Sequence, residues 1–333
     1  MGILVMYPGP SRVKKAISFE TLENVTFMKI LVATEKPFAK AAVDGIREIV
    51  EGAGYELALL EKYADKAELL AAVADADGLI VRSDKVTREV IDAARNLKIV
   101  VRAGAGYDNV DLAACTERGI VVMNTPGQNS NAVAELVVSM MIFISRNQFT
   151  PGTGAEVSGK RLGIHAYGNV GRIVARYGRA LGMSVKAFDP FVDPRQLEAD
   201  GVEAVGTVEE LYASSDYVSL HIPATAQTRG SIGYELLSSM PKGGVLINTA
   251  RKEVIDEQGL IRAFEERADL KYITDIAAEA QPLLTEKFGK RVCATPKKMG
   301  AETAEANINA GLAAARQIVD FFKTGDTRFQ VNR

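Results

Sequence analysis

Three residue types are scarce in this chain, and their scarcity narrows what the protein can be. Tryptophan is absent, and there are two histidines and two cysteines among 333 residues. Cys115 and Cys293 are too few for a disulfide framework or a cysteine-rich zinc site. We therefore expect no bound metal, and this cysteine usage is typical of a protein from the reducing cytoplasm.

An excess of one charge and a long apolar run are also absent. The 40 Lys and Arg residues are matched by 42 Asp and Glu, and no basic stripe indicates nucleic-acid binding. The longest apolar run, residues 137–144, is interrupted by Ser139 and is too short to span a bilayer. We expect a cytoplasmic protein with neither a nucleic acid nor a membrane as its partner.

The first 27 residues differ from the rest of the sequence. They contain Pro8, Gly9 and Pro10 and then a short basic run, but they lack the charged start and apolar core of a signal peptide. A strand-like run begins only at Met28. We interpret residues 1–27 as an extension outside the fold; a weak organelle-targeting segment is the alternative.

Short β-rich runs alternate with helical patterns along the remaining chain. This alternation predicts an α/β protein with two Rossmann-like or flavodoxin-like doubly wound parallel sheets. The runs are apolar without clean alternation, as expected for strands covered on both faces. The expected strands span residues 29–33, 79–81, 99–102, 120–123, 162–166, 185–188, 217–221, 245–248, 272–276 and 292–294.

Two long helical patterns, residues 129–147 and 301–322, flank the second set of strands. The chain is therefore expected to leave a first domain, build a second and return. We predict a discontinuous first domain, residues 28–127 plus 300–333, and a second domain, residues 128–299; the motifs described below identify these as the substrate-binding and the NAD-binding Rossmann domain. A ligand cleft is expected between the two, at the carboxyl ends of their strands.

Residues 161–171 predict a strand that enters a glycine turn and then a helix, the pattern of a dinucleotide-binding unit. Gly168 would let the backbone approach a pyrophosphate, and Gly171 would let the helix pack closely on the strand. Asp189, which ends the next strand, is placed to bind the ribose hydroxyls and to repel a 2′-phosphate, which favours NAD over NADP. The first glycine of the usual pattern is replaced by Ala166.

Three arginines, Arg82, Arg102 and Arg251, each follow an apolar run that predicts a strand. Arginine forks suit anionic substrates, and the backbone N–H groups of residues 104–106 suit a carboxylate. For any one segment, a tight turn or a solvated surface residue explains the pattern equally well. In the second domain, Arg251, Asp275 and the segment 295–297 all lie at or just after the ends of strand-like runs, and their convergence at the carboxyl ends of strands favours a binding site.

Taken together, these motifs resemble the D-2-hydroxyacid dehydrogenase family, and within it the short, lysine-type D-3-phosphoglycerate dehydrogenases. The resemblance covers about residues 28–325, with its motifs in the family's order. The segments that carry it are residues 81–83, 102–111, 122–127, 134–136, 167–171, 219–223 and 248–251.

The resemblance implies three groups of site residues. In the catalytic group, Arg251 matches the family arginine, Lys297 stands where the family has a histidine after Thr-Pro, and Glu279 lies one residue before the family glutamate position. The implied cofactor-binding residues are Tyr167, Gly168, Asn169, Val170, Gly171, Asp189, His221, Ile222, Pro223, Thr249, Ala250 and Asp275. The implied substrate-binding residues are Arg82, Ser83, Arg102, Gly104, Ala105 and Gly106.

The function that this resemblance implies is NAD-dependent oxidation of D-3-phosphoglycerate to 3-phosphohydroxypyruvate, the entry to serine synthesis. A lysine acid needs no carboxylate to fix a tautomer, so the joint loss of histidine and glutamate is coherent. The alternatives are a reductase of another 2-keto acid, such as hydroxypyruvate or glyoxylate, and a catalytically silent NAD-binding scaffold. A homodimer is expected, joined through the nucleotide-binding domains and the apolar helix at 129–147.

Overall fold

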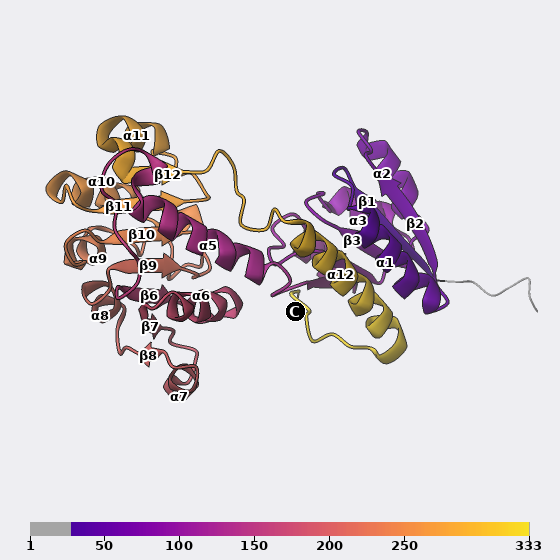
Figure 1. The fold of residues 1–333 in the computed structure, drawn as a ribbon. Helices are drawn as coiled ribbons and strands as arrows, with labels where there is room; N and C mark the ends of the chain where they lie inside the picture. The colour runs from indigo at the N-terminus through magenta and orange to yellow at the C-terminus, as the bar shows by residue number, and fades with distance from the viewer. Residues whose placement is uncertain (1–27, 333) are drawn as a thin grey trace, which may run out of the picture.

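The computed structural model describes residues 28–332, so the predicted extension lies outside the described residues. Two parallel sheets follow one another along the chain, and each is covered by helices on both faces (Figure 1). This arrangement confirms the predicted doubly wound α/β class. Within residues 28–332, none of the helices combines the length and hydropathy needed to cross a membrane.

The first sheet has five parallel strands in the order β2-β1-β3-β4-β5. Its chain order reverses between β1 and β3, so ligands are expected above the carboxyl ends of these strands. The strands are β1 (Lys29–Thr34), β2 (Glu56–Glu61), β3 (Gly78–Val81), β4 (Ile99–Arg102) and β5 (Val121–Asn124). The helices around this sheet are α1 (Lys40–Gly52), α2 (Lys66–Val73), α3 (Arg88–Ala93), α4 (Leu112–Glu117) and α12 (Ala304–Thr324).

The second sheet has seven parallel strands in the order β12-β11-β10-β9-β6-β7-β8, with its switch point between β6 and β9. The strands are β6 (Arg161–His165), β7 (Ser184–Phe188), β8 (Glu203–Ala204), β9 (Tyr217–Leu220), β10 (Val245–Asn248), β11 (Lys271–Thr274) and β12 (Val292–Ala294). The helices are α5 (Ser130–Ser145), α6 (Asn169–Ala180), α7 (Pro194–Ala199), α8 (Val208–Ala213), α9 (Tyr234–Ser239), α10 (Glu257–Glu266) and α11 (Gln281–Phe288). Three short 3₁₀ turns are η2 (Asn147–Phe149), η3 (Lys252–Val254) and η4 (Gly289–Arg291).

Each face of each sheet has its own apolar core. In the first sheet, α1 and α12 pack side by side and bury Ile46 and Ile318 against the strands, so the chain returns to its first unit (Figure 1). The segment after α12 is tied to β5, because the buried Asn332 side chain accepts a hydrogen bond from the Val122 N–H (2.7 Å) and donates to the Ile120 carbonyl (2.8 Å). In the second sheet, one core lies beneath α5 and α6 and the other beneath α8 to α11.

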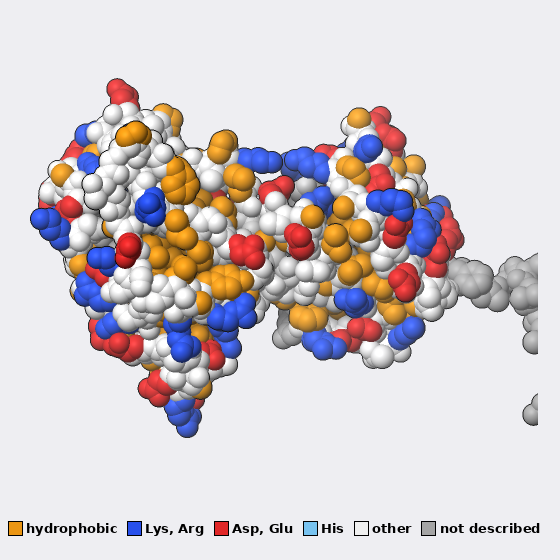
Figure 2. Space-filling model, viewed as in Figure 1, with side chains coloured by type: hydrophobic (Ala, Val, Ile, Leu, Met, Phe, Trp, Pro, Cys, Tyr) orange, Lys and Arg blue, Asp and Glu red, His pale blue; other side chains and the backbone are white. Residues whose placement is uncertain are grey.

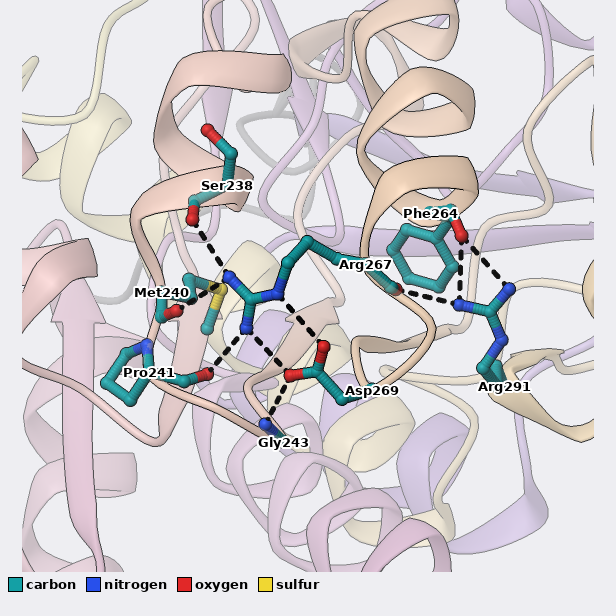
Figure 3. Close-up of polar contacts among 8 residues, drawn as sticks. All are labelled: Ser238, Met240, Pro241, Gly243, Phe264, Arg267, Asp269 and Arg291. Atoms are coloured by element: carbon teal, nitrogen blue, oxygen red, sulfur yellow. Dashed lines mark hydrogen bonds and ion pairs between the residues drawn. The ribbon is translucent and has the colours of Figure 1, made fainter.

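The amino ends of β10 and β11 are joined by a polar network centred on Arg267 (Figure 3). Its guanidinium donates to the carbonyls of Ser238, Met240 and Pro241 and pairs with Asp269 at 2.7 Å. This pairing with Arg267 holds the pKa of the Asp269 carboxyl well below its usual range. The network lies at the opposite ends of the strands from those where ligands are expected, so its role is to hold the sheet together.

Candidate active site

Residues from the carboxyl ends of both sheets line two adjoining cavities. The larger, which we call the cationic cavity, has a volume of about 450 Å³, and the smaller, which we call the apolar cavity, about 270 Å³. Both are lined by Arg251 and Lys298. Their lining residues come from both sheets, so the cavities lie between the two lobes, which Figure 2 shows joined by a narrower waist.

Arg251 reaches the cationic cavity from the turn that follows β10. The buried Asn248 at the end of β10 shapes this turn, because its side chain donates to the Arg251 carbonyl (3.0 Å) and accepts from the Ala250 N–H (2.9 Å). Within residues 28–332, the Arg251 guanidinium donates one hydrogen bond, from Nη1 to the Ala250 carbonyl at 2.9 Å. Its other N–H groups are thus left to bind an anion in the cavity.

Arg102 faces Arg251 from the end of β4. Its Nε donates to the Arg82 carbonyl at 2.9 Å, which fixes the side chain against the neighbouring strand. Burial, followed by repulsion from Arg82, lowers the pKa of Arg102. Binding of an anionic ligand would offset this burial and this repulsion between cations. Gly104 is required here because a Cβ at this position would overlap the Arg102 guanidinium.

Arg82 does not line either cavity, although it lies directly beside the cationic cavity at the end of β3. Its Nη1 donates to the Lys36 and Pro37 carbonyls at 3.2 and 3.4 Å. Its Nη2 donates to the Asn307 side-chain oxygen of α12 at 2.5 Å. The returning helix and the loop after β1 therefore position this arginine together.

Lys298, and not Lys297, is the lysine that lines both cavities. The Lys298 residue is open to solvent on one side, yet the protein around its ammonium group lowers the pKa, first by burial and then by repulsion from Arg251. Lys297 is exposed, and its carbonyl accepts a hydrogen bond from the Thr295 hydroxyl at 2.6 Å. The loop thus presents to the cavity the second of the two adjacent lysines.

Asp275 anchors the loop that carries this lysine. The residue is fully buried at the end of β11, and its Oδ2 accepts hydrogen bonds from the N–H groups of Gly300 (2.7 Å) and Met299 (3.3 Å). Burial nevertheless raises the pKa of the Asp275 carboxyl. Glu279 lies elsewhere: its side chain is 82% exposed, pairs with Lys252 at 3.0 Å and lines neither cavity.

The glycine turn after β6 has the shape that a dinucleotide requires. Asp189 accepts hydrogen bonds from the N–H groups of Tyr167 (2.8 Å) and Phe191 (2.9 Å), which holds its carboxylate beside the turn. A Cβ on Gly171 would overlap the carbonyl oxygen of Ala166, so only glycine fits there. Ala166, where the usual pattern has glycine, takes that residue's left-handed backbone, with φ of 80°.

The apolar cavity is lined mainly by apolar groups, with Asn129, Arg251 and Lys298 among them. Among the described residues, Thr249 Oγ1 and His221 Nε2 of this lining are buried without a hydrogen-bond partner, and so is Oδ1 of Asp275, which bonds the lining residue Gly300. Burial, followed by repulsion from His165, lowers the pKa of His221 to about 3, so its ring is neutral at physiological pH. An aromatic ring that carries an amide group would satisfy such a lining, and a nicotinamide is such a ring.

The structure brings most of the sequence-predicted site residues to these two cavities. Six cofactor candidates line the apolar cavity, namely Val170, His221, Ile222, Pro223, Thr249 and Ala250. The substrate candidates Ser83, Arg102, Ala105 and Gly106 line the cationic cavity. Sequence reasoning missed Asn129, Val133, Gly300 and Ala301, as well as Asn307 beside Arg82. Of these residues, only Asn129 had a signal in the sequence, because the predicted helix begins there and the residue precedes α5 in the structure.

Comparison with known proteins identifies the class to which this site belongs. The catalytic-domain model of the D-isomer specific 2-hydroxyacid dehydrogenases matches residues 31–332. The chain therefore belongs to the D-isomer specific 2-hydroxyacid dehydrogenase family, as its motifs predicted.

Individual relatives narrow the comparison further. The chain is 39% identical over 271 residues to D-3-phosphoglycerate dehydrogenase of Methanocaldococcus jannaschii, which covers 76% of this chain and 51% of that protein. It is 36% identical over 284 residues to hydroxypyruvate reductase of Thermotoga maritima, covering 79% of this chain and 90% of that protein. The chain thus spans about half the length of the first relative and most of the second.

A solved structure is similar over nearly the whole fold. The NAD⁺-bound 3-phosphoglycerate dehydrogenase of Entamoeba histolytica is 52% identical in sequence and superimposes with a TM-score of 0.82. The match covers 92% of this chain and 99% of that one.

Proposed function

We propose that this chain is an NAD-dependent dehydrogenase that oxidises D-3-phosphoglycerate to 3-phosphohydroxypyruvate, the entry to serine synthesis. The observation that carries the proposal is the cationic cavity, in which Arg102, Arg251 and Lys298 converge. The cationic side chains of this cavity outnumber its two acidic ones, Asp108 and Glu302, and the substrate offers a carboxylate and a phosphate to pair with them. The similarity to phosphoglycerate dehydrogenases supports the same choice.

NAD would lie across the glycine turn and the apolar cavity. The ribose hydroxyls would meet Asp189, the pyrophosphate would meet the N–H groups at the start of α6, and the nicotinamide would meet Thr249 and Asp275. When bound, NAD accepts the hydride from C2 of the substrate. The remaining work, which is binding, orientation and proton transfer, belongs to the side chains of this protein.

Arg251 binds the substrate carboxylate and polarises the oxygen on C2. Lys298 exchanges the proton with that oxygen, and it takes this role in place of Lys297 because it lines both cavities. Glu279 has no part in this scheme, since it is paired with Lys252 outside the cavities.

The lowered pKa of Lys298 sets the direction of the pH dependence. Oxidation needs the neutral amine to accept a proton, so its rate rises with pH through the pKa of Lys298. Reduction needs the ammonium to donate, so its rate falls over the same range. Because the pKa is lowered, both changes occur at a lower pH than for an ordinary lysine.

Two single variants test the assignment of the lysine. Lys298→Ala should lower turnover by about 10²–10⁴-fold and leave NAD affinity nearly unchanged, because general acid–base catalysis contributes that much. Lys297→Ala is the matched control and should retain most of its turnover. If Lys297→Ala is the inactive variant, Lys298 is not the proton-transfer residue.

A reductase of hydroxypyruvate is the second candidate, because the Thermotoga maritima relative with that name is matched over 90% of its length. The two functions differ in the phosphate. A panel of 3-phosphoglycerate, hydroxypyruvate and glyoxylate with NAD and NADP, followed at the nicotinamide absorbance band, separates them. NAD binding without turnover of any 2-hydroxy acid would instead establish a silent scaffold.

Two further proposals concern organisation. Residues 28–127 plus 300–333 would form the substrate-binding domain and residues 128–299 the NAD-binding domain, in line with the two sheets and the return of α12 to α1.

The protein would be a homodimer joined through α5 and its surroundings. Light scattering at low micromolar concentration that gives monomer mass would refute the dimer.

A further inference from the structure

Helix α6 presents three arginines on one face, away from the two cavities between the sheets. Arg172, Arg176 and Arg179 follow one another at spacings of four and three residues, which places them on one side of a helix. They line a third cavity of about 460 Å³, together with Tyr167, Ile173, Ala199 and Asp200. Lys and Arg side chains are gathered over α6 on this face of the molecule (Figure 2). We call this space the arginine cavity.

The three guanidinium groups have no anionic partner in the part of the chain that the structure describes. Among residues 28–332, none of them forms an ion pair. Arg172 Nε donates to the Tyr167 carbonyl at 3.1 Å, and Arg179 donates to the Asp200 carbonyl. Arg176 lies 5.2 Å from the Tyr177 ring centre. Each guanidinium has five N–H donors, so most of them are available to a ligand.

The carboxylate in this cavity is already engaged. Asp200 accepts a hydrogen bond from the Tyr167 hydroxyl at 3.0 Å, and burial together with this bond raises the pKa of Tyr167 to about 12. Three arginines thus surround a cavity with one carboxylate, and that carboxylate is bonded to a tyrosine.

Two of the three arginines are unfavourable for the helix by itself, whereas Arg179, in the last turn, is favourable to the helix dipole. Arg172 lies near the amino end of α6, where the helix dipole disfavours a cation, and the first turn contains no acidic residue to offset it. Arg172 and Arg176 are four residues apart, so they repel one another. A surface helix selected only for stability would place carboxylates here, so the pattern indicates a bound anion.

We propose that the arginine cavity is a binding site for a small phosphate-bearing anion, separate from the positions of the cofactor and the substrate. Planar guanidinium forks bind phosphate oxygens bidentately, which ammonium groups cannot do. A cavity of this volume accommodates more than one phosphoryl group, so inorganic pyrophosphate is a suitable probe. The inner wall of the cavity is Tyr167, whose N–H holds Asp189 beside the glycine turn.

The experiment must separate this site from the cationic cavity and from the glycine turn, since both also suit phosphate. Pyrophosphate binding is therefore measured by calorimetry on the full chain carrying Arg251→Ala, with saturating NADH present. Arg176→Ala is then added to this background. Arg316→Ala is the matched control, because Arg316 is an exposed arginine of α12 in no ion pair among the described residues.

Arg176→Ala should raise the dissociation constant of pyrophosphate at least about tenfold, the loss expected for a charge-assisted hydrogen bond. Arg316→Ala should leave it unchanged, and Arg176→Lys should fall between the two. Arg176→Ala alone should also retain wild-type turnover. Equal pyrophosphate affinity with and without Arg176, or no binding in the Arg251→Ala background, would overturn the proposal.

Discussion

The loops that follow β4 and β6 both depend on glycine, but for opposite reasons. A Cβ on Gly104 would overlap the guanidinium of Arg102, which is the end of a flexible side chain. A Cβ on Gly171 would overlap the Ala166 carbonyl, which is backbone and belongs to the same turn. In the first unit glycine therefore makes room for a functional side chain, whereas in the second it makes room for the main chain.

This difference implies that the two units tolerate change differently. Displacing Arg102 would alter one proposed substrate contact, whereas displacing the Ala166 carbonyl would move the whole turn against its helix. Substitutions in the loop after β6 should therefore lower the stability of the fold, whereas substitutions in the loop after β4 should lower the affinity for substrate.

The largest effect is expected for Gly171→Ala. The added methyl group would overlap the Ala166 carbonyl oxygen and lie 3.0 Å from the Ile164 side chain, so the backbone of the turn must shift. Unfolding free energy should fall by about 3 kcal/mol, and NAD binding should be lost. Thermal unfolding and NADH fluorescence measure the two effects. Gly52→Ala is the control, because a Cβ there meets nothing within 4 Å; equal stability of the two variants would remove the contrast.

Gly104→Ala should have a smaller effect on stability and a selective effect on substrate. Gly104 has φ of 152°, and an alanine held there costs about 1–2 kcal/mol. Arg102 must swing away, so the KM for 3-phosphoglycerate should rise about tenfold, the loss of one charged hydrogen bond. NAD affinity should stay close to wild type. A loss of NAD affinity equal to that of Gly171→Ala would show that the two loops are not independent.

Asn307→Ala tests whether helix α12 helps to position Arg82 for substrate binding. Without the Asn307 oxygen, the Arg82 guanidinium loses its contact with α12. The KM for 3-phosphoglycerate should rise several-fold to about tenfold while kcat stays nearly constant, since a hydrogen bond to a charged group is worth that much. Asn309→Ala, an exposed neighbour on α12, should leave both unchanged. A fall in kcat without a change in KM would argue against a positioning role.

The smallest effect, and one of opposite sign, is expected for Ala166→Gly. Ala166 has φ of 80°, which glycine adopts without the strain imposed by a Cβ. Relief of this strain, less the greater freedom of glycine in the unfolded chain, should raise the unfolding free energy by about 0.5–1 kcal/mol. Chemical denaturation measures it. A clear loss of stability would show that the Ala166 methyl group contributes packing that outweighs the strain.

The sequence predicted most of the fold because its strands are apolar on both faces and separated by helical patterns. It missed β2 and β8, and the reason is physical. Neither of these edge strands contains a buried residue, so no continuous apolar run is needed, whereas the edge strands β5 and β12 each keep at least one buried apolar residue. The leucine-rich run of β2 also fails to alternate, and such a run does not distinguish a strand from a helix.

The site was predictable where strand ends determine it, as at Arg102 and Arg251. It was not predictable at Lys298, because two adjacent lysines follow Pro296 and spacing does not say which one faces the cavity. The choice follows from Asp275, whose hydrogen bonds to Met299 and Gly300 fix the register of the loop. The pairing of Glu279 with Lys252 is likewise a matter of tertiary contact.

The return of α12 to the first sheet also affects how the protein is made. The five strands of that sheet are complete once residue 124 has been synthesised, but Ile318 and Ala314 of α12 cover one of its faces. At ribosomal speeds, about 180 further residues take roughly 10–40 s, during which Ile46 and Val101 lack this cover. The first unit can therefore complete this core only after the second unit has been synthesised. Until then, a chaperone or the ribosome surface would have to shield the exposed apolar face.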